Sequence, residues 1–210
     1  MSQTLATPRL HERGVRIADG PEVLGAIAEP DCAAAIWSRQ PMPGFQDWID
    51  GLDPAQLPVI RTVLRPDHVH DVVQGLCDAN GLPDTAERYW LEADIADLAM
   101  RFSNVMQAPY LRLRLDRITT NACSKFHIDA LSARLLCTYR GNGTQYGFCA
   151  DTPIPEHIHQ LATGSPMVMR GTLWPEQPRC GLRHRSPPIA GTGVTRLVMV
   201  LDPLSELMDD

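Results

Sequence analysis

The chain has 210 residues, of which 44% are hydrophobic and 21% charged, and its formal net charge at pH 7 is −6. These values are typical of a globular domain and exclude a collagen-like or disordered chain, so we expect a single domain over residues 1–210. The acidic balance argues against a nucleic-acid partner, because non-specific binding depends on phosphate neutralisation by Lys and Arg.

The cysteines and the apolar runs indicate a cytoplasmic protein. Six cysteines are spread along the chain without any C-x-x-C pair, so free thiols are favoured over a disulfide framework or a structural zinc knuckle. No apolar run is long enough to cross a membrane, and residues 1–15 lack the apolar core of an export signal. We therefore expect a cytoplasmic location and no membrane partner.

The first part of the chain, residues 1–108, is expected to be mostly helical. Its clearest helix runs from about Asp84 to Met106, with Asp84 as the N-cap and Glu87 three positions on. One apolar stripe recurs there at spacings of three and four. Its members are Leu91, Ile95, Leu98, Phe102 and Val105. Further helical patterns cover residues 21–27, 44–52 and 66–79.

From Pro109 onward the hydrophobic period changes from helical to alternating, so residues 109–205 are expected to be rich in strands. Leu111, Leu113 and Leu115 alternate with Arg112, Arg114 and Asp116, which predicts a strand with one wet or charged face. Other strands are expected over residues 133–139, 167–170 and 194–201, between turns rich in Gly or Pro. Helices followed by strands indicate the α+β class.

Three side chains form a candidate metal site. His127 and Asp129 are two residues apart, so in an extended strand they project from the same face and can touch one ion. His184 lies far downstream, on a short segment before the last strand. Two imidazoles and one carboxylate leave coordination positions open, and this arrangement suits non-haem iron(II) oxygenases. A His–Asp hydrogen bond without any metal is the plainer interpretation of the H-x-D pair alone.

Arg196 is placed on an apolar face of the last predicted strand, together with Val198 and Val200. A charge there is costly unless an anion meets it. One interpretation is a buried ion pair with a carboxylate of the chain itself. The other is an anionic ligand, because the planar guanidinium pairs two-pronged with a carboxylate.

The order of these residues resembles that of the iron(II)- and 2-oxoglutarate-dependent oxygenases. The match consists of His127-Ile128-Asp129, His184-Arg185-Ser186-Pro187-Pro188 and Thr195-Arg196-Leu197. It lies between Phe126 and Pro203 and covers little of the helical first part. The chain also resembles a bacterial family catalogued only as a domain of unknown function, which lends it no activity.

The resemblance implies a double-stranded β-helix, or jelly roll, over residues 109–205, preceded by helices that pack against it. It implies that His127, Asp129 and His184 bind iron(II), and that Arg196 binds the distal carboxylate of 2-oxoglutarate. One position departs from the pattern. The residue two beyond the arginine is often Ser or Thr in such enzymes, and here it is Val198.

Three functions follow from this site. The first is an oxygenase that uses iron(II) and 2-oxoglutarate to hydroxylate or demethylate a small molecule or a side chain. The second is a protein that holds zinc or another divalent ion without turnover, as the lack of a hydroxyl at Val198 favours. The third, a nucleic-acid oxygenase, is opposed by the acidic charge. Aromatic candidates for a substrate platform are Tyr139, Tyr146 and Trp174.

Overall fold

The computed structural model describes residues 9–10, 14–149, 153–175 and 181–206. The α-helices are α1 (Phe45–Gly51), α2 (Val69–Ala79) and α3 (Ala86–Met106), and the 3-10 helices are η1 (Pro21–Ala28), η2 (Pro54–Gln56) and η3 (Pro66–His68). The strands are β1 (Arg9–Leu10), β2 (Val15–Ala18), β3 (Ala34–Trp37), β4 (Ile60–Leu64), β5 (Tyr110–Ile118), β6 (Ala133–Arg140), β7 (Gln145–Phe148), β8 (His159–Gln160), β9 (Met167–Arg170), β10 (Leu182–Arg185) and β11 (Arg196–Leu204). Helices and sheets are thus combined, which confirms the mixed character of the predicted class.

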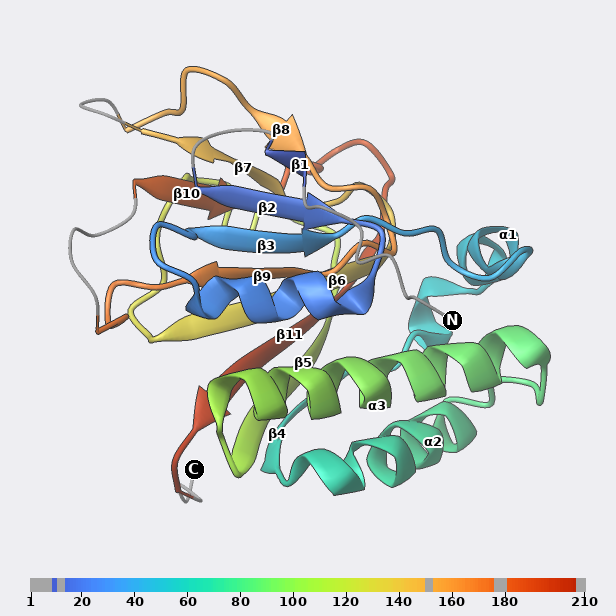
Figure 1. Cartoon of the computed structure of the whole chain (residues 1–210). Coiled ribbons are helices and arrows are strands. Elements are labelled where there is room, and N and C mark those ends of the chain that lie inside the picture. Colours follow the sequence, from blue (N-terminus) through green and yellow to red (C-terminus); the bar gives the residue numbers. More distant parts are fainter. Residues whose placement is uncertain (1–8, 11–13, 150–152, 176–180, 207–210) are drawn as a thin grey trace, which may run out of the picture.

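Eight strands form one large sheet in the order β1-β2-β3-β9-β6-β11-β5-β4, and β10-β7-β8 form a small sheet. Strand β2 pairs with β3 in parallel, and the other named pairs are antiparallel. An isolated antiparallel bridge between His127 and His184 places the H-x-D segment beside β10. In Figure 1 the small sheet lies at the top, and β4 and β5 lie at the opposite end of the large sheet, beside α2 and α3.

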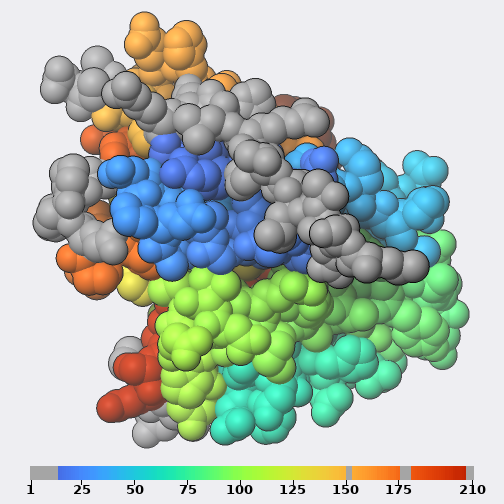
Figure 2. Space-filling model, viewed as in Figure 1, coloured from blue at the N-terminus to red at the C-terminus, as the bar shows by residue number. Residues whose placement is uncertain are grey.

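One face of the large sheet, the outer face, packs against helices. The apolar stripe of α3 and the leucines of β5 are fully buried in one core, where each such side chain contributes roughly 1.5–3 kcal/mol. Figure 2 shows the α3 segment (green) and the first strands with η1 (blue) meeting along this side of the molecule. The residues of the stripe buried there are Leu91, Ile95, Leu98 and Phe102, and those of β5 are Leu111, Leu113 and Leu115.

The opposite face, the inner face, carries a second apolar cluster and most of the polar side chains discussed below. Leu136, Met167 and Met169 of the large sheet are buried there with Tyr146 and Leu182 of the small sheet. Because strand residues alternate between faces, the inner face also includes Arg134 and Thr138 of β6 and Arg196, Val198, Val200 and Asp202 of β11. The two sheets therefore enclose a mixed apolar and charged interior.

Several boundaries differ from those expected. The N-cap of α3 is Thr85, whose hydroxyl accepts from the amide of Arg88 at 3.3 Å, whereas Asp84 bonds the Arg88 guanidinium instead. The last strand begins at Arg196, not at residue 194, because Gly191 and Gly193 hold the preceding turn at positive φ.

Helices predominate in residues 14–108, but β2, β3 and β4 were not predicted. Strand β3 is apolar along its length and shows no alternation, since it lies inside the sheet. The described cysteines are free, as predicted, and Cys180 lies outside the described residues. Among the described helices, none is both long enough and apolar enough to span a membrane.

Candidate metal centre

The backbone of the two distant segments brings the histidines together. The amide of His127 donates to the carbonyl of His184 at 3.0 Å, and the amide of His184 donates back to His127 at 3.0 Å. In such a reciprocal antiparallel pair the two side chains project to the same side, and the ring centroids here lie 4.4 Å apart. Asp129, two residues beyond His127, shares that side. The structure thus brings together the three residues predicted as a site.

The donor atoms of these residues converge. One ligand atom from each of His127, Asp129 and His184 lies within 4.8 Å of the others. Nε2 of His184 is 3.3 Å from Oδ2 of Asp129, and Nε2 of His127 is 3.7 Å from Oδ1 of the same carboxylate. His184 is 7% exposed, so this cluster lies at the edge of the interior and not on an open surface.

The ring nitrogens and the free carboxylate oxygen face one another. Nδ1 of His127 lies 2.8 Å from the carbonyl of Lys125, which can only accept, so Nδ1 is the donor of this bond and Nε2 is the ring nitrogen left for a ligand. Burial, followed by the charges of His127 and Arg134, lowers the pKa of His184 to about 3, so this imidazole is neutral at pH 7. Oδ2 of Asp129 is buried without a hydrogen-bond partner among the described residues. A divalent cation fits these donors, because it would satisfy all three at once.

Arg134 holds the other oxygen of Asp129. Its NH1 donates to Oδ1 of Asp129 at 2.6 Å, while Nε and NH2 donate to the two oxygens of Asp202 at 2.6 and 2.8 Å. Burial opposes this charge, but the hydrogen bonds and charges of Asp202 and Asp129 raise the pKa of Arg134. The carboxylate of Asp129 is thereby oriented with only Oδ2 left for a ligand. Sequence patterns did not single out Arg134 or Asp202.

Arg196 is fully buried, with 0% exposure, and its partners are all uncharged. Nε donates to the carbonyl of Asn142 at 2.6 Å, NH1 to the hydroxyl of Ser186 at 2.9 Å and NH2 to the hydroxyl of Thr138 at 3.3 Å. Among the described residues no carboxylate lies within ion-pair distance, so the interpretation of an internal ion pair is wrong for this part of the chain. Burial lowers the pKa of Arg196 to about 10, which leaves it charged at pH 7.

Two hydroxyl groups contact the guanidinium of Arg196, although the sequence suggested that a hydroxyl was missing there. Val198 lies two residues beyond Arg196 on the same face and carries no hydroxyl, but Thr138 and Ser186 both contact the guanidinium. Ser186 is two residues beyond His184, or roughly 7 Å along an extended chain. Arg196 and its hydroxyls therefore lie on the same side as the candidate metal ligands. Sequence reasoning missed Thr138, whose position in β6 shows that it shares the inner face with Leu136.

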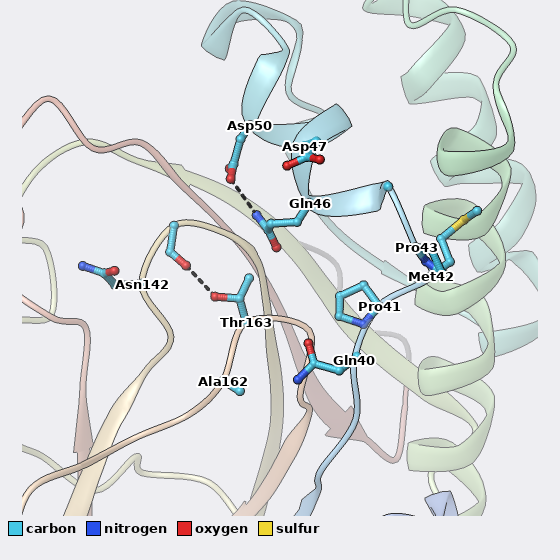
Figure 3. Close-up of a pocket in the computed structure, with 12 residues that line it drawn as sticks. Gln40, Pro41, Met42, Pro43, Gln46, Asp47, Asp50, Asn142, Ala162 and Thr163 are labelled. Carbon is cyan, nitrogen blue, oxygen red and sulfur yellow. Dashed lines mark hydrogen bonds between the residues drawn. The ribbon is translucent and has the colours of Figure 1, made fainter.

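A cavity of about 720 Å³ lies behind the turn that holds Arg196 (Figure 3). It is lined by residues 40–44, by α1 and by the turns at Gly141-Asn142 and Ala162-Thr163. Within it Gln46 bonds Asp50 at 3.0 Å and Thr163 bonds the carbonyl of Gly141 at 2.8 Å, as the dashed lines in Figure 3 mark. None of the three candidate ligands lines this cavity, so it is separate from the metal centre.

The three aromatic candidates differ in position, and Tyr146 is directly opposite His184 in the pairing of β7 with β10. Tyr139 points to the outer core, where its hydroxyl donates to Asp94 at 2.7 Å. Tyr146 stacks on His159 within the inner cluster, with ring centroids 5.3 Å apart. Trp174 packs against the outer core and beneath the guanidinium of Arg170.

A family model described as "Protein of unknown function (DUF1826)" matches residues 18–202. No curated protein sequence matches the chain significantly. Among solved structures, the chain is similar to an oxidoreductase of the 2OG-Fe(II) oxygenase family from Burkholderia pseudomallei, with a TM-score of 0.46 and 14% identity over 93% of this chain and 97% of that chain.

Two further structural similarities involve named oxygenases. The rice dioxygenase for auxin oxidation has a TM-score of 0.45 and 13% identity over 82% of this chain and 73% of that chain. A prolyl-4-hydroxylase from Pseudomonas putida has a TM-score of 0.36 and 15% identity over 79% of this chain and 96% of that chain.

Proposed function

The chain belongs to the DUF1826 family, whose description assigns no activity, and we propose that it is a non-haem iron(II)- and 2-oxoglutarate-dependent oxygenase. The observation that carries this proposal is a pair of complementary features on one side of the interior. Oδ2 of Asp129 is buried beside two imidazoles and has no partner among the described residues, and the buried Arg196 has no carboxylate partner there. A bound cation would compensate the buried oxygen of Asp129, and a bound anion would compensate the buried charge of Arg196.

We further propose that the two sheets form a double-stranded β-helix. Its support is the order of strand pairing, with β5-β11-β6-β9 in the large sheet and the His127 segment, β10, β7 and β8 in the small sheet. Along the chain, β5, the His127 segment, β6 and β7 alternate between the sheets, and so do β8, β9, β10 and β11. This alternation is what a jelly roll requires.

In this account His127, Asp129 and His184 hold iron(II). The bound iron supplies activation of molecular oxygen, coupled to decarboxylation of 2-oxoglutarate to succinate. Arg196 binds the distal carboxylate of the cosubstrate through the N–H groups that its three described bonds leave over, and Thr138 and Ser186 offer hydroxyls to the same carboxylate. The substrate gains one oxygen atom at a carbon, which yields a hydroxylated or demethylated product.

The proposal of a zinc-holding protein without turnover has less support. Structural zinc sites use four protein ligands, and the described part of the chain gathers three. The proposal of a zinc-holding protein also leaves the buried charge of Arg196 unexplained, since metal storage needs no anion at that position.

Succinate production tests the proposal. The protein is purified without oxygen and supplied with iron(II), 2-oxoglutarate and air, and succinate is measured with a broad panel of substrates. We expect binding of 2-oxoglutarate by calorimetry and succinate release above that of Asp129→Ala. Absence of both 2-oxoglutarate binding and succinate would remove the oxygenase account.

A further inference from the structure

The charged face of β5 is the inner face of the large sheet. Leu111, Leu113 and Leu115 point to the outer core, so Arg112 and Arg114 project to the opposite face, which carries Arg134 and Arg196. The sequence indicated only that this face is wet or charged. The structure adds that it is the face of the metal centre.

Strand register links Arg112 to the residues that orient Asp129. Arg112 lies directly opposite Asp202 of β11, and Asp202 accepts two hydrogen bonds from Arg134, which itself binds Asp129. Strands β5 and β6 flank β11, so the backbones at Arg112 and Arg134 are separated by two strand spacings, or roughly 10 Å. Arg114 lies opposite Val200, one step further along the same face.

The Nε atoms of these two half-buried arginines lack acceptors of the kind that Arg39 has. Nε of Arg112 and Nε of Arg114 are buried without an acceptor among the described residues. The nearest carboxylate to Arg114 is that of Asp116, at 3.9 Å, and no described ion pair involves Arg112. By contrast, Arg39 makes two bonds of 2.6 Å with Asp94.

A neighbouring arginine increases the local positive charge. Arg61 of β4 lies directly opposite Arg114 in the antiparallel pair, and like charges in that relationship repel. Two carboxylates lie near this row: Asp202 already accepts two bonds from Arg134, and Asp116 is 3.9 Å from Arg114. The three arginines of β4 and β5 therefore keep N–H donors that a further anion could use.

We propose that Arg112 and Arg114 bind an anionic group of the substrate, a phosphate or a carboxylate, on the face of the large sheet that carries Arg134; this inference rests on the proposed function. Planar guanidinium groups bind both anions two-pronged. The site is distinct from the one at Arg196, because Arg196 is opposite Ile118, six residues from Arg112 or roughly 20 Å along the strands. One short diacid cannot occupy both.

The test uses the full chain loaded with Mn(II), with inorganic phosphate as the probe and acetate as the carboxylate arm. Phosphorus NMR for phosphate and proton NMR for acetate follow line broadening by the paramagnetic ion, with a Zn(II)-loaded sample as the diamagnetic reference. The variants are Arg112→Gln and Arg114→Gln, singly and together. The control is Arg101→Gln, on the exposed surface of α3, where Arg101 pairs with Asp97 at 2.6 Å.

We expect phosphate or acetate to bind the wild type, and the dissociation constant to rise at least tenfold in the double variant while Arg101→Gln leaves it unchanged. Preference for phosphate over acetate, or the reverse, identifies the anion class. Equal binding by the double variant and the wild type, or no binding by the wild type, would each overturn the proposal.

Metal content and 2-oxoglutarate binding, measured on the same samples, separate this proposal from the previous one. If metal content and 2-oxoglutarate binding are normal and anion binding does not depend on Arg112 and Arg114, the proposed anion site is wrong and the oxygenase proposal stands. If both are absent and anion binding still depends on these arginines, the anion site stands and the oxygenase account is wrong. Thermal melting checks folding of the variants, and we expect Arg114→Gln to melt no lower than the wild type because it relieves repulsion with Arg61.

Discussion

Oδ2 of Asp129 lies 3.3 Å from Nε2 of His184, and no described donor satisfies that oxygen. The low pKa of His184, caused first by its burial, means that its ring is neutral at pH 7. The charge of the buried carboxylate is therefore not compensated by His184, and a cation between the two groups would compensate it. The remaining oxygen of Asp129 is held by Arg134, so the carboxylate cannot turn away.

Replacing Arg134 with Gln should weaken metal binding by about 10- to 100-fold, the range for residues that orient a metal ligand. The variant loses the 2.6 Å bond that fixes Asp129. Calorimetry with Mn(II) measures the change. Asp202→Asn is the milder companion variant, because it leaves the bond between Arg134 and Asp129 in place. Unchanged affinity in a folded Arg134→Gln protein would contradict the orienting role.

Replacing Arg196 with Met should abolish 2-oxoglutarate binding while leaving metal binding intact. Because Arg196 is buried without a carboxylate partner among the described residues, an apolar side chain of similar length removes a desolvation penalty. We therefore expect the melting temperature of the cosubstrate-free protein to be equal or higher. Calorimetry tests the loss of 2-oxoglutarate binding, and thermal melting tests the expected stability. A variant that binds 2-oxoglutarate like the wild type would exclude Arg196 from the site.

The metal-free protein should lose stability on mild acidification. The folded pKa of His184, about 3, lies below its ordinary value of 6.5, so the unfolded chain binds the extra proton between these values. The stabilising contribution is complete above pH 6.5 and is lost as the pH falls towards 3, a change on the order of 5 kcal/mol. Urea unfolding of the metal-free wild type and of His184→Gln over this range measures it. Equal pH dependence in both proteins would contradict the assignment.

Gly171→Ala should destabilise the protein and disturb the metal centre together. A Cβ at this position would lie 2.1 Å from the carbonyl oxygen of Leu131 and 2.7 Å from that of Asp129. We expect a loss of about 1–3 kcal/mol and weaker metal binding, because the backbone beside Asp129 must shift. Gly75→Ala is the matched control, since its Cβ meets nothing within 4 Å in an exposed part of α2, and it should stabilise by up to about 1 kcal/mol. Denaturant unfolding and metal titration of both variants check the pair.

The local parts of the site could be predicted, and its long-range parts could not. The spacing of His127 and Asp129 implies a common face in any extended segment. The pairing of His127 with His184 depends on the register between distant segments, which hydrophobic periodicity does not specify. The family resemblance was needed to predict it. Arg134 and Asp202 were missed for the same reason. Each falls on the inner face by alternation, but only the register of β6 and β11 makes them neighbours.

Fold prediction failed where tertiary context decides the structure. The long stripe of α3 was sufficient to place that helix, because four turns of regular spacing have no other explanation. Strands β2 and β3 have four residues each, and β3 is apolar on both faces, so no period distinguishes it from a helix or a buried loop.

Titration of metal-free protein with iron(II) under anaerobic conditions, in the wild type and in Asp129→Ala, tests the central claim most directly. The account predicts one equivalent of tightly bound iron in the wild type. It predicts none in the variant, whose circular dichroism should match that of the wild type. Full iron content in a folded Asp129→Ala protein would show that these three side chains are not the metal ligands.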